Sequence, residues 1–168
     1  MIADIPWEPD IYLHNLVHEM PHALSTAHYE ARIDTANGST FVHARGPGFG
    51  TYKNDNEVDL LDLTEGTTDL LADDVLRTTQ RTFANTEKYG PYQQSCRCVR
   101  LLIQACAERE GVRAPEMFLT FTRYYLRGDI PGLKAFIEER LGEETYQTLV
   151  ALNGYPEELG RYLKTKFF

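Results

Sequence analysis

Hydrophobic and polar positions along the chain follow two different periods, and the change between them divides the sequence into elements. Apolar residues spaced three or four apart predict a short helix over 10–20, which Pro21 is expected to close. Strand-like residues predict two short strands within 26–45, placed around Asn37-Gly38, a dipeptide that tolerates a tight hairpin turn. The glycine-rich stretch 46–50 predicts a loop, and the stretch 57–63 predicts a third strand.

Helical patterns fill the remainder of the chain. A helix is predicted over 69–88, with acidic residues early and basic residues late, and the next over about 95–110, with Ser95 as its N-cap. Val99, Leu102, Ile103 and Cys106 form the apolar stripe of that second helix. Four shorter helices are predicted over 115–127, 131–141, 143–152 and 156–166, separated by glycine, proline and Asn-Gly.

Together these elements predict an α+β fold, in which a small antiparallel sheet packs on a central cysteine-bearing helix. The last third of the chain is predicted to be helical. A length of 168 residues suits one domain, or one domain with an appendage. We expect residues 1–111 to form the core and residues 112–168 a helical extension packed on it.

Composition and charge narrow the possible partners. The net charge of −8 argues against general binding to nucleic-acid phosphates and against simple docking on anionic membranes. No stretch approaches the length of an apolar membrane-spanning helix, and the first residues do not have the pattern of a secretory signal. Three cysteines, an odd number, predict free thiols. The cytoplasm is therefore the expected location.

One cysteine and two strand histidines are the first candidates for chemistry. Cys96 lies near the predicted start of a helix and beside Arg97, a setting that favours the nucleophilic thiolate. His28 and His43 lie on the two predicted strands and can approach each other only if the turn spans about 34–39. A thiol, a base and a group that orients the base are the parts of a cysteine nucleophile.

The same residues resemble the NlpC-type peptidases of the papain-like superfamily. The late cysteine resembles the circularly permuted branch, which includes lecithin:retinol acyltransferase-like proteins. The resemblance implies that His28 is the base, His43 orients it and Cys96 attacks. The motifs that carry it are Ala27-His28-Tyr29, Asn37-Gly38, Phe41-Val42-His43-Ala44 and Gly46-Pro47-Gly48, followed by Tyr92-Gln93-Gln94-Ser95-Cys96.

This resemblance implies a thiol hydrolase or acyltransferase that acts on an amide, ester or thioester through an acyl-enzyme. Gln94 is a candidate for oxyanion support, and Tyr92 and Tyr29 are candidates for substrate binding. No cofactor is expected. The predicted substrate is a small molecule or a peptide.

Two other classes of function stay open. His14 and His18, with Asp10 and His22, recur at a spacing of four, which predicts one helical face and would suit a metal. Pro21 is expected to end that helix before His22, and the glutamate of the zinc-protease motif is absent.

The other class is a non-catalytic interaction module. The C-terminal third is rich in tyrosines, which suit protein interfaces as well as cores, so a protein partner could bind these helices. They are Tyr124, Tyr125, Tyr146, Tyr155 and Tyr162.

Overall fold

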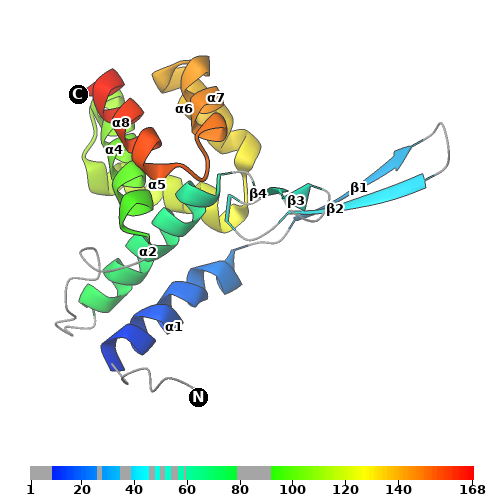
Figure 1. The fold of residues 1–168 in the computed structure, drawn as a ribbon, viewed down its shortest axis with the longest axis horizontal. Coiled ribbons are helices and arrows are strands. Elements are labelled where there is room, and N and C mark those ends of the chain that lie inside the picture. The colour runs from blue at the N-terminus through cyan, green and yellow to red at the C-terminus, as the bar shows by residue number, and fades with distance from the viewer. Residues whose placement is uncertain are drawn as a thin grey trace.

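The structure, a computed structural model, describes residues 9–25, 28–34, 39–45, 48–49, 52–53, 57–58, 60–78 and 92–168. Its helices and strands follow one another along the chain as drawn in Figure 1. In order, they are α1 (Pro9–Leu24), β1 (His28–Asp34), β2 (Ser39–Arg45), β3 (Tyr52–Lys53), β4 (Glu57–Val58), α2 (Leu61–Thr78), α4 (Gln93–Glu110), α5 (Ala114–Arg127), α6 (Ile130–Leu141), α7 (Glu143–Ala151) and α8 (Pro156–Phe167).

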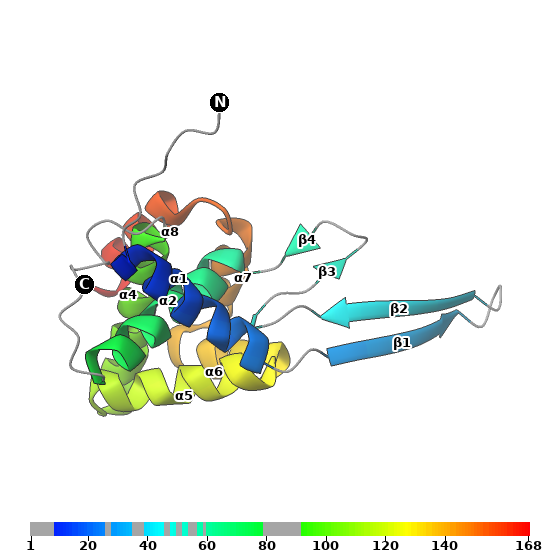
Figure 2. The ribbon, with the colours of Figure 1, turned by 90° about the horizontal axis from the view of Figure 1, so that it is seen from below.

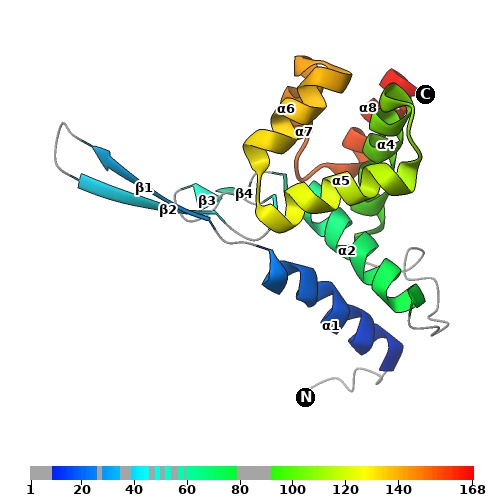
Figure 3. The ribbon, with the colours of Figure 1, turned by 180° about the vertical axis from the view of Figure 1, so that it is seen from behind.

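The predicted α+β fold, with a sheet packed on the Cys96 helix, is wrong. The body of the molecule is helical, and the apolar stripe of α4 is covered by α2, α5, α6 and α8 instead of by strands. The β1–β2 ribbon projects away from this body in all three ribbon views (Figures 1, 2 and 3). Helices can bury the apolar stripe of α4 as well as a sheet can, because either supplies an apolar face.

Helix α4 is the centre of the main hydrophobic core. Val99, Leu102 and Cys106 are at most 1% exposed and belong to one cluster that continues into the C-terminal helices. Leu133, Leu149 and Leu163 contribute to that cluster from α6, α7 and α8. Residues on both sides of residue 111 therefore contribute to one cluster, and the division into a core and an extension packed on it stays a prediction.

The four predicted C-terminal helices correspond to α5–α8, with boundaries that differ by one residue at most. The left-handed backbone at Gly111 and Gly128 ends α4 and α5, a conformation that glycine adopts without a steric cost. Asp129 caps α6 by accepting a hydrogen bond from the Gly132 N–H at 2.9 Å.

The N-terminal boundaries differ more from the predictions. Helix α1 continues through Pro21 to Leu24, because proline removes only one hydrogen bond there and the next turn closes with Ser25 N–H donating to Pro21 O at 2.9 Å. The predicted strand over 57–63 is wrong from residue 60 onward, since Leu60 adopts φ 62° and α2 begins at Leu61. The predicted helix over 69–88 is described only to Thr78.

The helix α2 is held at its start by residues distant in sequence. The Asp62 N–H donates to Asn153 Oδ1 at 3.2 Å, and the Asp62 carboxylate accepts from Ser95 Oγ at 3.1 Å and from the Gly154 N–H at 2.8 Å. Ser95 is therefore a buried partner of Asp62, and the predicted N-cap role is wrong because α4 begins two residues earlier, at Gln93.

The hairpin register is set by the pairing of Asp34 with Ser39. The connection therefore spans residues 35–38, wider than a two-residue Asn37-Gly38 turn, and the turn itself lies outside the described residues. No helix in the described part of the chain has both the length and the apolar character needed to cross a membrane.

Candidate metal centre

Two rows of ionisable side chains face each other where α1 packs on α2. Histidines 14, 18 and 22 recur every four residues on α1, and Glu65, Asp69 and Asp73 recur every four residues on α2. A spacing of four keeps side chains on one helical face, so each row lies along one edge of the contact. The two rows together place imidazoles against carboxylates over two helical turns.

His18 stands in the middle of this interface and contacts two carboxylates. Its Nδ1 lies 2.6 Å from Asp69 Oδ1, and its Nε2 lies 3.2 Å from Glu65 Oε2. The residue is 7% exposed, and the ring of Tyr92 stacks on the imidazole at a centroid distance of 5.4 Å. Both ring nitrogens of His18 are therefore fixed in direction.

His22 is fixed in a similar way from the next turn. Its Nε2 lies 3.7 Å from Glu65 Oε2, and its Nδ1 is hydrogen bonded to the Tyr125 hydroxyl at 3.2 Å. That hydroxyl is in turn hydrogen bonded to Thr68 Oγ1 at 2.7 Å, and Tyr125 is fully buried. A partner from α5 thus orients a histidine of α1 toward Glu65.

The geometry of these three residues fits a metal ion. The ligand atoms of His18, His22 and Glu65 all lie within 4.8 Å of one another. With metal–ligand bonds of about 2.0–2.1 Å, tetrahedral coordination needs ligand atoms about 3.3 Å apart. The two nitrogen–oxygen distances, 3.2 and 3.7 Å, are close to that value. A metal-bound histidine commonly forms a hydrogen bond through its other ring nitrogen, and here Asp69 and Tyr125 are the partners of His18 and His22.

The electrostatics of the metal-free cluster are those of a buried ion pair. Burial alone would lower the pKa of His18, but hydrogen bonds and charges from Asp69 and Glu65 outweigh it and raise the pKa to about 9. Burial would raise the pKa of Glu65, but hydrogen bonds to His18 and His22 and their charges lower it to about 2. A metal ion would take the place of the shared proton, since it requires neutral imidazole and ionised carboxylate.

His14 lies at the other end of the row and is not among the three converging ligands. Its Nε2 is 3.8 Å from Asp69 Oδ1 and 3.7 Å from Asp73 Oδ1, so it contacts the carboxylates without reaching Glu65. Of the two histidines predicted as alternative metal ligands, His18 is at the centre of the cluster and His14 lies at its edge.

Cys96 is buried beside this cluster and faces α2. It is 5% exposed, and its Sγ lies 3.7 Å from both Gly66 O and Asp69 Oδ2. Burial raises the pKa of its thiol, and the charges of Asp69 and Asp73 raise it further. These surroundings favour the neutral thiol, whereas the predicted nucleophile needs a thiolate.

The two histidines predicted to activate Cys96 lie on the β1–β2 ribbon. The register places His28 opposite Arg45 and His43 opposite Glu30, so the two positions are diagonal neighbours. The described hydrogen bonds of Cys96 go to Gly66 and Asp69 on α2. Tyr29 is opposite Ala44 on the same ribbon. The Cys96–His28–His43 triad thus stays a prediction without support from the described contacts.

The other two predicted site residues near Cys96, Tyr92 and Gln94, lie in different parts of the molecule. Tyr92 stacks on His18 and joins the metal cluster, where burial and then the charge of Glu65 raise the pKa of its hydroxyl. Gln94 lines a groove between α4 and α8, whereas Cys96 faces α2.

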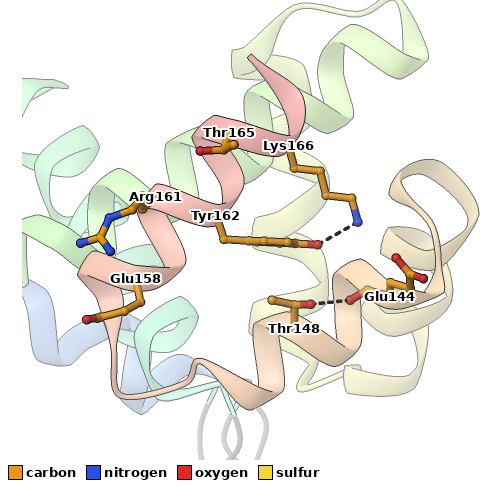
Figure 4. Close-up of a pocket in the computed structure, with 7 residues that line it drawn as sticks. All are labelled: Glu144, Thr148, Glu158, Arg161, Tyr162, Thr165 and Lys166. Atoms are coloured by element: carbon orange, nitrogen blue, oxygen red, sulfur yellow. Dashed lines mark hydrogen bonds between the residues drawn. The ribbon is translucent and has the colours of Figure 1, made fainter.

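A second depression, of about 600 Å³, lies over α7 and α8 (Figure 4). Lys166 Nζ donates to the Tyr162 hydroxyl at 2.8 Å and to Thr145 Oγ1 at 3.2 Å, so these polar groups satisfy one another. Among the tyrosines predicted to form an interface, Tyr125 and Tyr146 are buried in the core, while Tyr155 is 61% exposed.

No protein-family model, curated protein or solved structure significantly matches the chain. The resemblance to permuted NlpC-type enzymes therefore stays a prediction.

The sequence pattern placed His22 in the histidine row, but Pro21 was expected to end the helix before it, and Tyr125 was assigned only to an interface. Glu65 and Asp69 were not predicted as site residues, although the acidic spacing in 65–73 matches the histidine spacing. The contribution of Tyr125 had no comparable signal, because it depends on how α5 packs.

Proposed function

We propose that the protein binds a divalent transition-metal ion, with Zn²⁺ as the best match, between α1 and α2. The protein ligands are His18 Nε2, His22 Nε2 and a carboxylate oxygen of Glu65. The observation that carries this proposal is the convergence of these three groups while Asp69 and Tyr125 hold the opposite nitrogens of the two imidazoles. Two histidines and one glutamate form a donor set that suits zinc.

Three protein ligands leave a fourth tetrahedral position for water or for a substrate oxygen. An ion bound in this way lowers the pKa of coordinated water toward 7 and polarises a carbonyl or phosphoryl oxygen. Metal-assisted hydrolysis is therefore the reaction class that the donor set supports. Acyl transfer through Cys96 has less support, because burial and two aspartates raise the pKa of the thiol.

Affinity for the metal is expected to rise with pH. The pKa of His18 is about 9 in the metal-free cluster, so at neutral pH the ion must displace a proton from the imidazole. Zinc titrations of the EDTA-treated, dialysed full-length protein should show one site per chain, with tighter binding at pH 8 than at pH 6.5.

A matched set of variants tests the ligand assignment. His22→Gln and Glu65→Gln should each weaken zinc binding by more than about 100-fold, beyond the 10–100-fold typical of an outer-shell change. Tyr125→Phe should fall within that outer-shell range. His14→Gln, the same substitution two turns away on α1, should change affinity by less than threefold, an estimate based on its place outside the converging ligands.

Substitution with Co²⁺ supplies a readout that a merely structural cluster would not produce. A tetrahedral Co²⁺ site gives intense visible absorption, which His22→Gln should abolish while His14→Gln keeps it. The proposal would be overturned if the wild-type protein failed to bind Zn²⁺ at pH 8, or if both histidine variants lost affinity equally. A buried ion-pair network would then explain the cluster.

A further inference from the structure

A groove of about 280 Å³ between the start of α4 and α8 gathers positive charge on an otherwise acidic protein. Three of the side chains that line it are cationic, one is a carboxylate and one is an amide. The net charge of the chain is −8, so the local excess of cations runs against the average of the molecule. The lining residues are Gln94, Arg97, Glu157, Gly160, Arg161 and Lys164.

The three cations of this groove have no carboxylate partner among the described residues, unlike several other basic residues of the body. Elsewhere, Arg113, just before α5, forms an ion pair with Glu116 of that helix, and Lys134 forms one with Glu138 on α6. Within the described part of the chain, Arg97, Arg161 and Lys164 form no ion pair with a carboxylate. Like charges brought together without a counter-charge repel one another, and a bound anion would relieve that repulsion.

Close packing between α4 and α8 fixes the walls of the groove. The Cys98 thiol donates to Pro156 O at 3.0 Å, and a Cβ at Gly160 would lie 3.5 Å from Cys98 Sγ. Arg161 extends away from the Tyr162–Lys166 hydrogen bond in Figure 4, so it is not part of that polar group. The cations of the groove therefore project from two helices that are locked together.

We propose that this groove binds a phosphate group, free or carried by a small phosphate ester. Arg97 and Arg161 each present a planar fork of donors that matches two phosphate oxygens, Lys164 adds a point charge, and the Gln94 amide can donate a further hydrogen bond. The volume is below the usual range for drug-sized ligands, which favours a ligand little larger than the phosphate itself. This site is separate from the metal centre and does not rest on it.

Phosphate binding is best measured by titrating inorganic phosphate into EDTA-treated protein and following backbone amide NMR shifts at constant ionic strength. The shifts should concentrate at residues 94–97 of α4 and 157–164 of α8, and sodium chloride at equal ionic strength should not reproduce them. A parallel titration with phenyl phosphate distinguishes the two sources of the phosphate group. Tighter binding of the ester identifies a phosphorylated ligand, and tighter binding of inorganic phosphate identifies the free ion.

Substitutions that remove a positive or a negative charge from the groove should change phosphate affinity in opposite directions. Arg97→Gln and Arg161→Gln should each weaken phosphate binding about tenfold, the effect of losing one charge-assisted contact. Glu157→Gln should tighten it several-fold, because a carboxylate no longer opposes the anion. Arg97, Arg161 and Glu157 are all exposed, so the fold should tolerate these substitutions.

Arg123→Gln is the matched control, since Arg123 is an exposed arginine on α5 and its loss changes the net charge equally. Its affinity for phosphate should equal that of the wild type. Equal weakening by Arg123→Gln, or shifts that chloride reproduces, would show general screening and overturn the site.

Discussion

The two largest contacts of α2 differ in chemistry. Toward α1 it presents Glu65, Asp69 and Asp73 to three histidines, and toward α4 it presents Gly66 to a close crossing against Ser95 and Val99. A Cβ at position 66 would lie 2.5 Å from Ser95 O, so the backbones of α2 and α4 approach too closely for a larger side chain. Figure 3 shows α2 between α1 and the rest of the body.

This difference separates the part of the molecule that provides stability from the part suited to chemistry. The main cluster around α4 contains no described residue of α1, which has its own small cluster of Val17, Ala72 and Leu76. The α1–α2 contact therefore relies more on charges and hydrogen bonds. Charged groups respond to pH and to metal ions, whereas a close-packed apolar core does not.

The largest expected effect concerns the three cysteines of α4. Burial raises the pKa of Cys98 and Cys106 to about 12 and raises that of Cys96 as well. Iodoacetamide at pH 7.5 should label all three at least about a thousandfold more slowly in the native protein than in guanidinium chloride, because labelling requires opening of the core. Peptide mass spectrometry measures each site separately.

Rapid native labelling of Cys96 alone would contradict this view of the core. It would restore the thiol nucleophile predicted from sequence, and His28→Ala should then slow the reaction. Uniformly slow labelling would show that Cys96, like Cys98 and Cys106, is a buried residue of the core.

The next effect compares the two hydrophobic clusters. Leu102→Ala, at a position with no exposed surface in the main cluster, should lower the free energy of unfolding by about 2–5 kcal/mol. Val17→Ala in the small cluster should cost about 1.5 kcal/mol, since it removes two methyl groups. Urea denaturation of both variants measures the difference.

Leu16→Ala is the control for helix α1 itself. Leu16 is 63% exposed, so this change should alter the free energy of unfolding by less than about 0.5 kcal/mol. Equal losses for Leu102→Ala and Val17→Ala would mean that α1 is as firmly packed as α4, which would remove the contrast between the two contacts.

The sequence predicted the C-terminal helices well because their limits are encoded locally. Glycine at 111 and 128 ends one helix and proline at 115, 131 and 156 begins the next, and these preferences act within a few residues. The apolar stripe of α4 could also be identified from the sequence, but a stripe does not specify whether helices or strands will cover it. That ambiguity produced the incorrect α+β prediction.

The N-terminal half depends on contacts between distant residues. Asn153 accepts from the first turn of α2, and Leu60 adopts a positive φ that no apolar pattern predicts. The metal centre forms where α1, α2 and α5 meet. The spacing of the histidines on α1 could be seen in the sequence, but the residues of α2 and α5 that contact them could not. Pro21 was given too much weight, because a proline in a last turn costs one hydrogen bond without ending the helix.

The last expected effect is the pH dependence of the metal-free protein. The pKa of His18 is raised from 6.5 to about 9 in the folded state, so its contribution to stability is full below pH 6.5 and is lost as pH rises through 9. The pKa of Glu65 is lowered from 4.5 to about 2, so its contribution is full above pH 4.5 and is lost as pH falls through 2. Stability from this pair should therefore be greatest between pH 4.5 and 6.5.

Urea denaturation in EDTA at pH 6 and pH 9.5 measures the alkaline side of this window. The wild type should lose about 2 kcal/mol over that range, the worth of hydrogen bonds to a charged group. His18→Gln should be less stable at pH 6 and should show a much smaller change with pH, because glutamine has no proton to lose. An unchanged slope in His18→Gln would mean that other groups titrate there, and the contrast between a charge-dependent α1–α2 contact and a charge-independent α4 core would no longer hold.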